Sequence, residues 1–354
     1  MKFCVIGSGA IGGYLAVKLA LSGQDVTVVA RNRNLDAIRT RGIELLNHDG
    51  EHEARVQVSA VPTPHEAGAQ DVVILAVKAH QVAPLVNDLA ALVNGETVLI
   101  PMQNGIPWWY FQRLNSPYEG RTVESVDPGG VIARSIDPER IVGCVVYPAA
   151  ELQEPGVVRH VEGTRFPIGE LDGQTTERAQ TISAALTAAG LKSPILPDIR
   201  SEIWLKLWGN LSFNPISALT HATLEDICKY PVSRELARSM MLEAQAIAHK
   251  VGAHFRVDVE QRIAGAEKVG AHKTSMLQDV ECGREPEIDA LLGSVIEIGR
   301  ITGTSTPALD AVYACVKLLA RVLTQHEAAV RLNARDAASP RGGASGETRM
   351  PISE

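Results

Sequence analysis

The residues best suited to chemistry are a lysine and two asparagines spaced by four. Lys206, Asn210 and Asn214 stand in the segment IWLKLWGNLSFNP, residues 203–215. Residues four apart lie on one side of a helix, so these side chains would face the same way. Burial among the surrounding tryptophans and leucines would lower the pKa of the Lys206 ammonium towards neutrality. Such a lysine can give its proton to a carbonyl oxygen while hydride reaches the carbon.

A plainer interpretation of this stripe stays open. A lysine can lie along an apolar surface with its ammonium in water, and polar stripes at this spacing are common on helices. Pro215 lacks an N–H, frees a carbonyl one turn earlier and predicts a kink in the helix.

A glycine pattern at the N-terminus predicts a dinucleotide site. The sequence GSGAIG is a GxGxxG that follows the apolar strand FCVI and opens a helical stretch. Its glycines would permit a tight turn, a close approach to pyrophosphate and close packing of helix on strand, with the helix N-terminus facing the anion. A purely structural turn is the alternative. The expected cofactor contacts are Gly7, Ser8, Gly9, Ala10, Ile11 and Gly12.

The end of the second predicted strand favours NADPH over NADH. An acidic residue there would bind the ribose 2′-hydroxyl of NAD, but the sequence reads VTVVARNRN. A guanidinium can hold a 2′-phosphate by paired charge-assisted bonds. We therefore expect Arg31 to contact NADPH, whereas Arg33 also fits a solvated turn.

The first half of the chain predicts a doubly wound α/β domain. Apolar strands are expected at residues 3–6, 26–29, 71–77 and 97–101, with helices at 10–21 and 81–92. Continuous apolar strands alternating with helices indicate a parallel sheet covered on both faces. Four extended pieces, at 129–133, 141–149, 156–163 and 165–171, are expected at the antiparallel end of the same sheet. A last helix is expected over 177–189.

The second half predicts an all-helical domain. Helical periodicity covers residues 202–219, 232–251 and 285–302, and two prolines within 194–198 suggest the boundary. We expect a cofactor-binding domain at 1–197, a helical substrate domain at 198–326 and a flexible tail at 327–354, which lacks apolar periodicity.

Composition excludes several classes of protein. A net charge of −7 gives no broad reason to bind nucleic acid or an anionic membrane. Five cysteines without a CxxC pair suggest reduced thiols, and His249 and His272 have no partner at metal-ligand spacing, so no metal is expected. No apolar run reaches membrane-spanning length, and the chain opens on a strand with no room for a signal peptide, which favours the cytoplasm.

Four further short motifs, together with those above, resemble the motifs of a known family. They are VKAHQ with Lys78, QNG with Asn104, SMLQD from Ser275 and PEID with Glu287. Lys78 and Asn104 follow parallel strands, where ligands bind in such sheets. Together with GxGxxG and KLxxNxxxNP, these motifs resemble the ketopantoate reductase family over residues 1 to about 323.

The resemblance implies a fold, a reaction and roles for residues. It implies a Rossmann-like domain followed by a helical domain like the C-terminal one of 6-phosphogluconate dehydrogenase. The implied activity is NADPH-dependent reduction of a 2-oxo acid, 2-dehydropantoate to (R)-pantoate in pantothenate biosynthesis. Lys206 would be the general acid and Glu287 the orienting carboxylate. The implied substrate ligands are Asn104, Lys206, Asn210, Asn214 and Ser275, the last near the carboxylate, and the implied further cofactor contacts are Lys78, Asn104 and Ala150.

Several of these residues have ordinary structural alternatives. Glu287 could pair with Arg284 on a surface, and Ser275 could cap the following helix. Asp279 and Asp289 are interpreted as structural. The pair Trp108 and Trp109 could wall a substrate pocket or pack against the helical domain, and both interpretations stay open.

One departure from the family leaves the substrate open. Members that reduce ketopantoate often carry another asparagine where this chain has Leu224, and a missing amide would leave a substrate hydroxyl unpaired. Reduction of a different 2-oxo acid is therefore an alternative, and a silent NADP-binding sensor protein is a second. A homodimer is the default expectation for such a protein.

Overall fold

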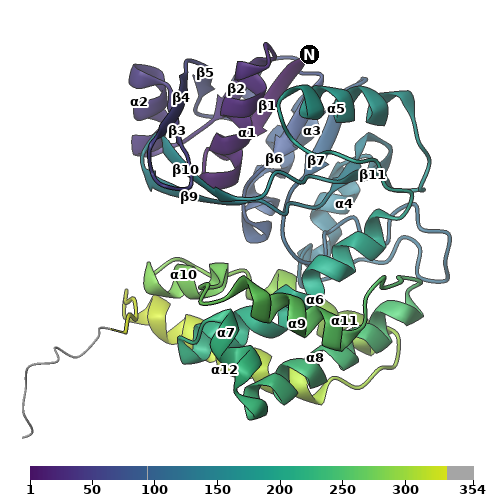
Figure 1. The fold of residues 1–354 in the computed structure, drawn as a ribbon. Coiled ribbons are helices and arrows are strands. Elements are labelled where there is room, and N and C mark those ends of the chain that lie inside the picture. The colour runs from purple at the N-terminus through teal and green to yellow at the C-terminus, as the bar shows by residue number, and fades with distance from the viewer. Residues whose placement is uncertain (94, 333–354) are drawn as a thin grey trace, which may run out of the picture.

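The structure, a computed structural model, describes residues 1–93 and 95–332 (Figure 1). Its central sheet is parallel, with strand order β5-β2-β1-β6-β7. The strands are β1 (Lys2–Ile6), β2 (Asp25–Val29), β5 (Ser59–Val61), β6 (Val72–Leu75) and β7 (Val98–Pro101). The helices of this region are α1 (Ala10–Leu21), α2 (Asn32–Arg41) and α3 (Val86–Leu92). The four predicted strands are confirmed, and β6 and β7 are buried along their whole length.

The strand order brings three loops to one edge of the sheet. β1 lies between β2 and β6, and β6 pairs with β7, all in parallel. The carboxyl ends of β1, β6 and β7 therefore lie together. The segments that begin at Gly7, Val77 and Met102 leave the sheet at that edge.

The extended pieces after residue 128 differ from the expectation of one continuous sheet. A separate sheet has the order β4-β3-β10-β9, and β11 pairs with β8. These strands are β3 (Ile43–Leu46), β4 (His52–Val56), β8 (Val142–Cys144), β9 (Ala149–Glu154), β10 (Val157–Glu162) and β11 (Ile168–Glu170). Of these strands, β8 adjoins the central sheet, through a bridge between Leu99 and Ile141, the residue before β8. The prediction was therefore wrong for β9 and β10, which form a separate sheet with β3 and β4, two strands that sequence periodicity did not reveal.

Two local predictions in this region need correction. Residues 129–133 belong to a 3-10 turn (Pro128–Gly130) and to helix α4 (Val131–Ser135), not to a strand. The Asp127 carboxylate accepts hydrogen bonds from the backbone N–H of Ile132 at 2.8 Å and of Ala133 at 2.9 Å, which stabilises the first turn. The helix expected over 81–92 begins as two 3-10 turns, Ala79–Gln81 and Ala83–Leu85, because Pro84 donates no backbone hydrogen bond.

The chain from Ile199 to Gln325 consists of helices joined by short connections, as predicted for the second half. Its helices are α6 (Ile199–Thr220), α7 (Leu224–Lys229), α8 (Pro231–Lys250), α9 (Val259–Val269), α10 (Ser275–Glu281), α11 (Ser294–Ile301) and α12 (Pro307–Gln325), and α5 (Glu177–Ala188) precedes them. The helix expected over 285–302 starts later, with a π turn at Asp289–Gly293. No helix in the described part of the chain has the length and hydropathy of a membrane span. Residues 333–354 of the expected tail lie outside the described residues.

Helix α6 connects the two halves of the molecule and lies between them (Figure 1). Asp198 caps it by accepting the N–H of Ser201 at 2.9 Å, and the helix continues through Pro215. Trp204 and Trp208 are fully buried in the core that surrounds it. Trp108 and Trp109 are buried in that same core, so of the two open interpretations the structure supports packing.

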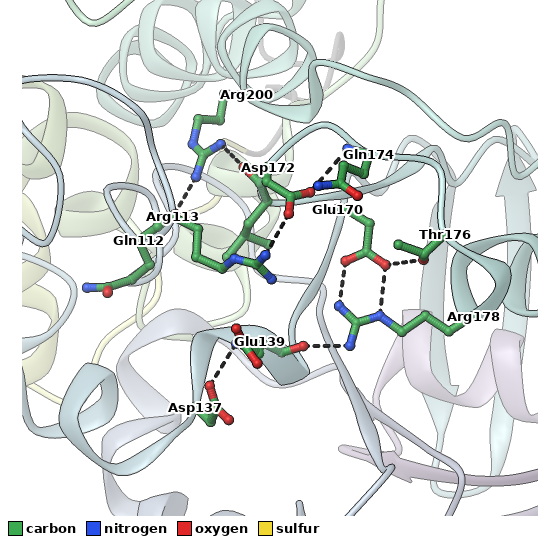
Figure 2. Close-up of polar contacts among 11 residues, drawn as sticks. Gln112, Arg113, Asp137, Glu139, Glu170, Asp172, Gln174, Thr176, Arg178 and Arg200 are labelled. Atoms are coloured by element: carbon green, nitrogen blue, oxygen red, sulfur yellow. Dashed lines mark hydrogen bonds and ion pairs between the residues drawn. The ribbon is translucent and has the colours of Figure 1, made fainter.

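A buried arginine anchors the start of α6 against two loop segments of the first half of the chain. Arg200 donates to the backbone carbonyls of Tyr110 at 2.8 Å, Gln112 at 2.6 Å and Leu171. Figure 2 shows this arginine beside a second network, in which Glu170 binds the Arg178 guanidinium through both oxygens, at 2.8 and 2.5 Å. The first turn of α6 therefore has a fixed position relative to the sheet.

Candidate active site

The glycine turn after β1 has the geometry that its sequence predicts. Gly7 has φ +102°, and a Cβ there would lie 2.8 Å from the carbonyl oxygen of Ala76. A Cβ on Gly12 would lie 1.8 Å from the carbonyl oxygen of Gly7. Side chains are thus excluded at both positions, which lets α1 start directly against the strand ends.

The start of α1 faces a cavity of about 920 Å³, which we call the glycine cavity; Gly7, Gly9, Ala10 and Ile11 are among its lining residues. A Cβ on Gly9 would meet nothing within 4 Å, and no side chain caps α1. Free N–H groups at an uncapped helix start favour an anion. The residues present therefore fit the pyrophosphate of a dinucleotide. Ser8 and Gly12 do not line this cavity; Ser8 instead accepts a hydrogen bond from Asn34 to its carbonyl at 2.7 Å.

Arg31 lies two residues after the end of β2 and is the N-cap residue of α2. Its side chain is exposed. Arg31 is not among the residues that line the glycine cavity, and no acidic residue stands between β2 and α2.

Lys206 reaches from α6 to the loop that follows β7. Its Nζ donates to Oδ1 of Asn104 at 2.6 Å and to the carbonyl of Val146. Burial lowers the pKa of Lys206 to about 8, and the charge of Glu287 partly opposes that shift. The side chain retains some exposure, and it lines a second cavity. Lys206 therefore borders that cavity, and its lowered pKa allows proton release near neutral pH.

Glu287 contacts the turn that follows β6. Its Oε1 accepts the backbone N–H of Ala79 at 3.0 Å. Burial raises the pKa of Glu287, while that backbone hydrogen bond and the charge of Lys78 lower it. Arg284 binds Asp279 at 2.8 Å instead, so the alternative of a surface pair between Glu287 and Arg284 is not found.

Lys78 and Asp279 form a contact between the two halves of the chain. Nζ of Lys78 lies 3.0 Å from Oδ2 of Asp279 and 2.5 Å from the carbonyl of Glu285. Both Lys78 and Asp279 line the glycine cavity. Sequence reasoning interpreted Asp279 as structural and did not predict its ion pair with Lys78, because nothing local to SMLQD indicates what it faces.

The second cavity has a volume of about 670 Å³, and we call it the lysine cavity. All five predicted substrate ligands line it: Asn104, Lys206, Asn210, Asn214 and Ser275. Asn214 lies 3.5 Å from the Ser275 hydroxyl, and Thr274 rather than Ser275 caps α10. Asn104 and Ala150 line both cavities, so the two cavities meet beside the Lys206 amine.

Other residues of the lysine cavity were not predicted as site residues. Leu224, at the start of α7, lines it. So do Arg256, shortly before α9, and Arg262, on α9. His272 also lines it, but the described residues contain no group of three possible metal ligands. The signal that could have identified Arg262 is Gly209, an otherwise unexplained glycine within α6.

Comparisons with known proteins agree over most of the chain. The model of the family "Ketopantoate reductase PanE/ApbA" matches residues 3–173, and that of its C-terminal part matches residues 198–320. The 2-dehydropantoate 2-reductase of Mesorhizobium japonicum is 52% identical over 90% of this chain and 98% of its own.

Solved structures have the same fold. A protein of Ralstonia solanacearum assigned to the ketopantoate reductases is 38% identical, with a TM-score of 0.86 over 91% of this chain and 98% of its own. The 2-dehydropantoate 2-reductase of Geobacter metallireducens is 26% identical, with a TM-score of 0.78 over 90% and 99%. A D-mandelate dehydrogenase, solved with NADH and anilino(oxo)acetate, is 21% identical with a TM-score of 0.78 over 92% and 99%, which shows the fold alone. This chain, with its glycine turn and its lysine cavity, belongs to the ketopantoate reductase family.

Proposed function

We propose that this protein reduces 2-dehydropantoate to (R)-pantoate with NADPH. The observation that carries the proposal is the Lys206 amine, 2.6 Å from Asn104 at the junction of the two cavities. The similarity to the Mesorhizobium 2-dehydropantoate 2-reductase supports the choice of substrate. We assign the cofactor to the domain of residues 1–197 and the proton donor to that of residues 198–326.

Residues of this chain supply the proton and orient the group that donates it. Bound NADPH supplies hydride at the carbonyl carbon. Lys206, with a pKa of about 8, donates the proton that the developing alkoxide needs. Asn104 accepts from the Lys206 amine and so holds it at the junction. Glu287 is held by the N–H of Ala79, and its charge favours the protonated form of the lysine.

The neutral polar groups of the lysine cavity bind the substrate. Asn210 and Asn214 follow Lys206 at intervals of four on α6, and the Ser275 hydroxyl lies next to Asn214. Groups placed to hydrogen-bond a substrate also reject analogues that lack the matching polar atoms. On the cofactor side, we assign Lys78 and Asn104 to contacts with the nicotinamide half and Ala150 to a further contact with the cofactor.

NADPH is favoured over NADH because Arg31 stands where NAD-binding domains carry an acidic residue. Replacement of Arg31 by alanine should weaken NADPH binding by about tenfold or more, the effect of losing one charge-assisted hydrogen bond. NADH binding should change little. Fluorescence titration with both cofactors measures this, and an unchanged preference would remove the argument.

Leu224 favours a second candidate, the same reduction of another 2-oxo acid. Its apolar side chain lines the lysine cavity where family members often carry an asparagine. An apolar wall favours an acid with an apolar substituent over one with a hydroxyl.

One experiment separates these possibilities. Purified protein is mixed with NADPH and a panel of 2-oxo acids, with the Lys206→Ala variant alongside. Oxidation of NADPH that is fastest with 2-dehydropantoate supports the proposal, and oxidation only with other acids supports the second candidate. Bound NADPH without any oxidation would support a silent sensor. Lys206→Ala should lose most turnover and keep its affinity for NADPH; equal loss of both would make the lysine structural.

A further inference from the structure

An arginine of α9 points at the lysine cavity with its charge unpaired. Within residues 1–93 and 95–332, the Arg262 guanidinium makes no hydrogen bond and no ion pair, although it lines the cavity. It is half-buried, and burial lowers its pKa. A half-buried cation without a counterion is costly unless an anion binds it.

A glycine in α6 makes room for this guanidinium. A Cβ on Gly209 would lie 2.0 Å from Nη2 and 2.8 Å from Cζ of Arg262. Any other residue at 209 would displace the side chain. Gly209 follows Lys206 by three residues, so the two lie on the same side of α6, with Cβ positions about 5–6 Å apart. The Arg262 guanidinium therefore lies against α6 about one helical turn from the backbone of Lys206.

The other cations of the lysine cavity are committed elsewhere. Arg256 binds the buried carboxylate of Glu202, with 2.5 Å between Nη1 and Oε2. Lys206 must release its proton to the product, so it cannot remain the counterion of a carboxylate through the reaction. Arg262 is the cation left to neutralise the charge that every 2-oxo acid carries.

We propose that Arg262 binds the carboxylate of the 2-oxo acid and gives the enzyme its preference for acids over neutral ketones. This inference rests on the proposed function and adds a residue that sets its specificity. A guanidinium can form two parallel hydrogen bonds with a carboxylate. The Ser275 hydroxyl, which the family resemblance places near the carboxylate, then donates to the same group, and Asn214 remains for the other polar groups of the substrate.

The test compares an acid with its neutral counterpart. Arg262→Met should lower kcat/KM for 2-dehydropantoate by about 10- to 100-fold, chiefly through KM, as expected for the loss of a charge-assisted hydrogen bond. The Arg262→Met variant should reduce the neutral lactone of 2-dehydropantoate at the wild-type rate. Millimolar guanidinium chloride should restore part of the lost activity with the acid. Lys268→Met, which removes an exposed charge from the same helix outside the cavity, should match wild type with both substrates.

A second variant leaves the arginine in the sequence. Gly209→Ala suits a helix but displaces the guanidinium, so it should raise KM for the acid and leave that for the lactone unchanged. If Arg262→Met does not fold, the Gly209→Ala variant tests the inference in its place. An unchanged KM for the acid, or an equal loss with acid and lactone, would overturn the inference.

Calorimetric binding of pantoate separates this inference from the proposed function. If the wild type reduces no 2-oxo acid, the proposed function fails. In that case weaker pantoate binding by Arg262→Met still supports the carboxylate site, and equal binding overturns it.

Discussion

In the proposed reaction the proton donor is a single amine, and burial sets its pKa. Lys206 has a pKa of about 8, and only its protonated form can act as general acid. We expect kcat/KM for reduction to be level at neutral pH and to fall above pH 8, approaching tenfold per pH unit. A profile from pH 6 to 10, measured with saturating NADPH, checks this.

Glu287 provides a control for assigning that pH dependence. Its charge raises the pKa of Lys206, so Glu287→Gln should move the fall in kcat/KM to lower pH, whatever it does to the maximum rate. If the fall stays at the same pH, the titrating group is not the lysine that Glu287 faces. A wild-type profile that stays level to pH 10 would mean that another group supplies the proton.

Residues with a motif around them could be predicted, and residues placed only by packing could not. Lys206 and Asn104 stand in recognisable segments, and the structure brings them together. Arg262 stands in VEQRIAGAEK, which alone is typical of a solvated helix. Only the crossing of α9 over Gly209 turns its side chain towards the cavity.

At the scale of elements, α6 depends on one buried anchor at its start. The three backbone carbonyls that Arg200 satisfies belong to two other segments of the chain (Figure 2). Arg200→Met would leave them without these donors in the interior, and unsatisfied buried groups cost free energy. We expect a loss of about 3 kcal/mol or more in the free energy of unfolding, measured by urea denaturation.

Arg113→Met is the matched control for that loss. Arg113 lies near Arg200 in Figure 2 and binds Asp172 at 2.6 Å. Its pair is partly exposed, with side-chain exposures of 31% and 23%, so its removal should cost about 1 kcal/mol or less. Equal losses for the two variants would mean that Arg200 does not anchor the helix as described.

Elements with strong periodicity were predictable, and elements with marginal burial were not. Long apolar helices such as α6 and α8 emerge from the sequence within a few residues. β4 is mostly exposed along its length, so no alternation identified it. α4 begins with the β-branched residues Val131 and Ile132, which favour a strand. Hydrogen bonds to the Asp127 carboxylate stabilise a helix there instead.

At the scale of the whole molecule, the site exists only where the two halves meet. The contacts of Lys78 with Asp279 and of Ala79 with Glu287 each join the strand half to the helical half. The sequence predicted both halves and site roles for Lys78 and Glu287. It could not give their relative placement, because that depends on which side chains pack between them.

A buried carboxylate links the same two halves and gives the molecule a pH-dependent stability. Glu202 of α6 is 3% exposed and accepts hydrogen bonds from Tyr147 and Arg165 on the strand side and from Arg256 on the helical side. Burial alone would raise the pKa of Glu202, but these hydrogen bonds outweigh it and lower the pKa to about 2.

Because the pKa is lower in the folded state, the ionised Glu202 stabilises the protein above its unfolded pKa of about 4.5, and this stability is lost as the pH falls towards 2. The full contribution is about 3 kcal/mol. Other carboxyl groups titrate in the same range, so the measurement is a difference: urea unfolding of wild type and of Glu202→Gln at pH 7, 5, 4 and 3.

The wild type should be the more stable by several kcal/mol at pH 7, since the glutamine leaves two guanidinium groups without their counterion. That advantage should shrink steadily below pH 4.5, and an advantage that stays constant down to pH 3 would show that Glu202 is not held ionised by the groups around it.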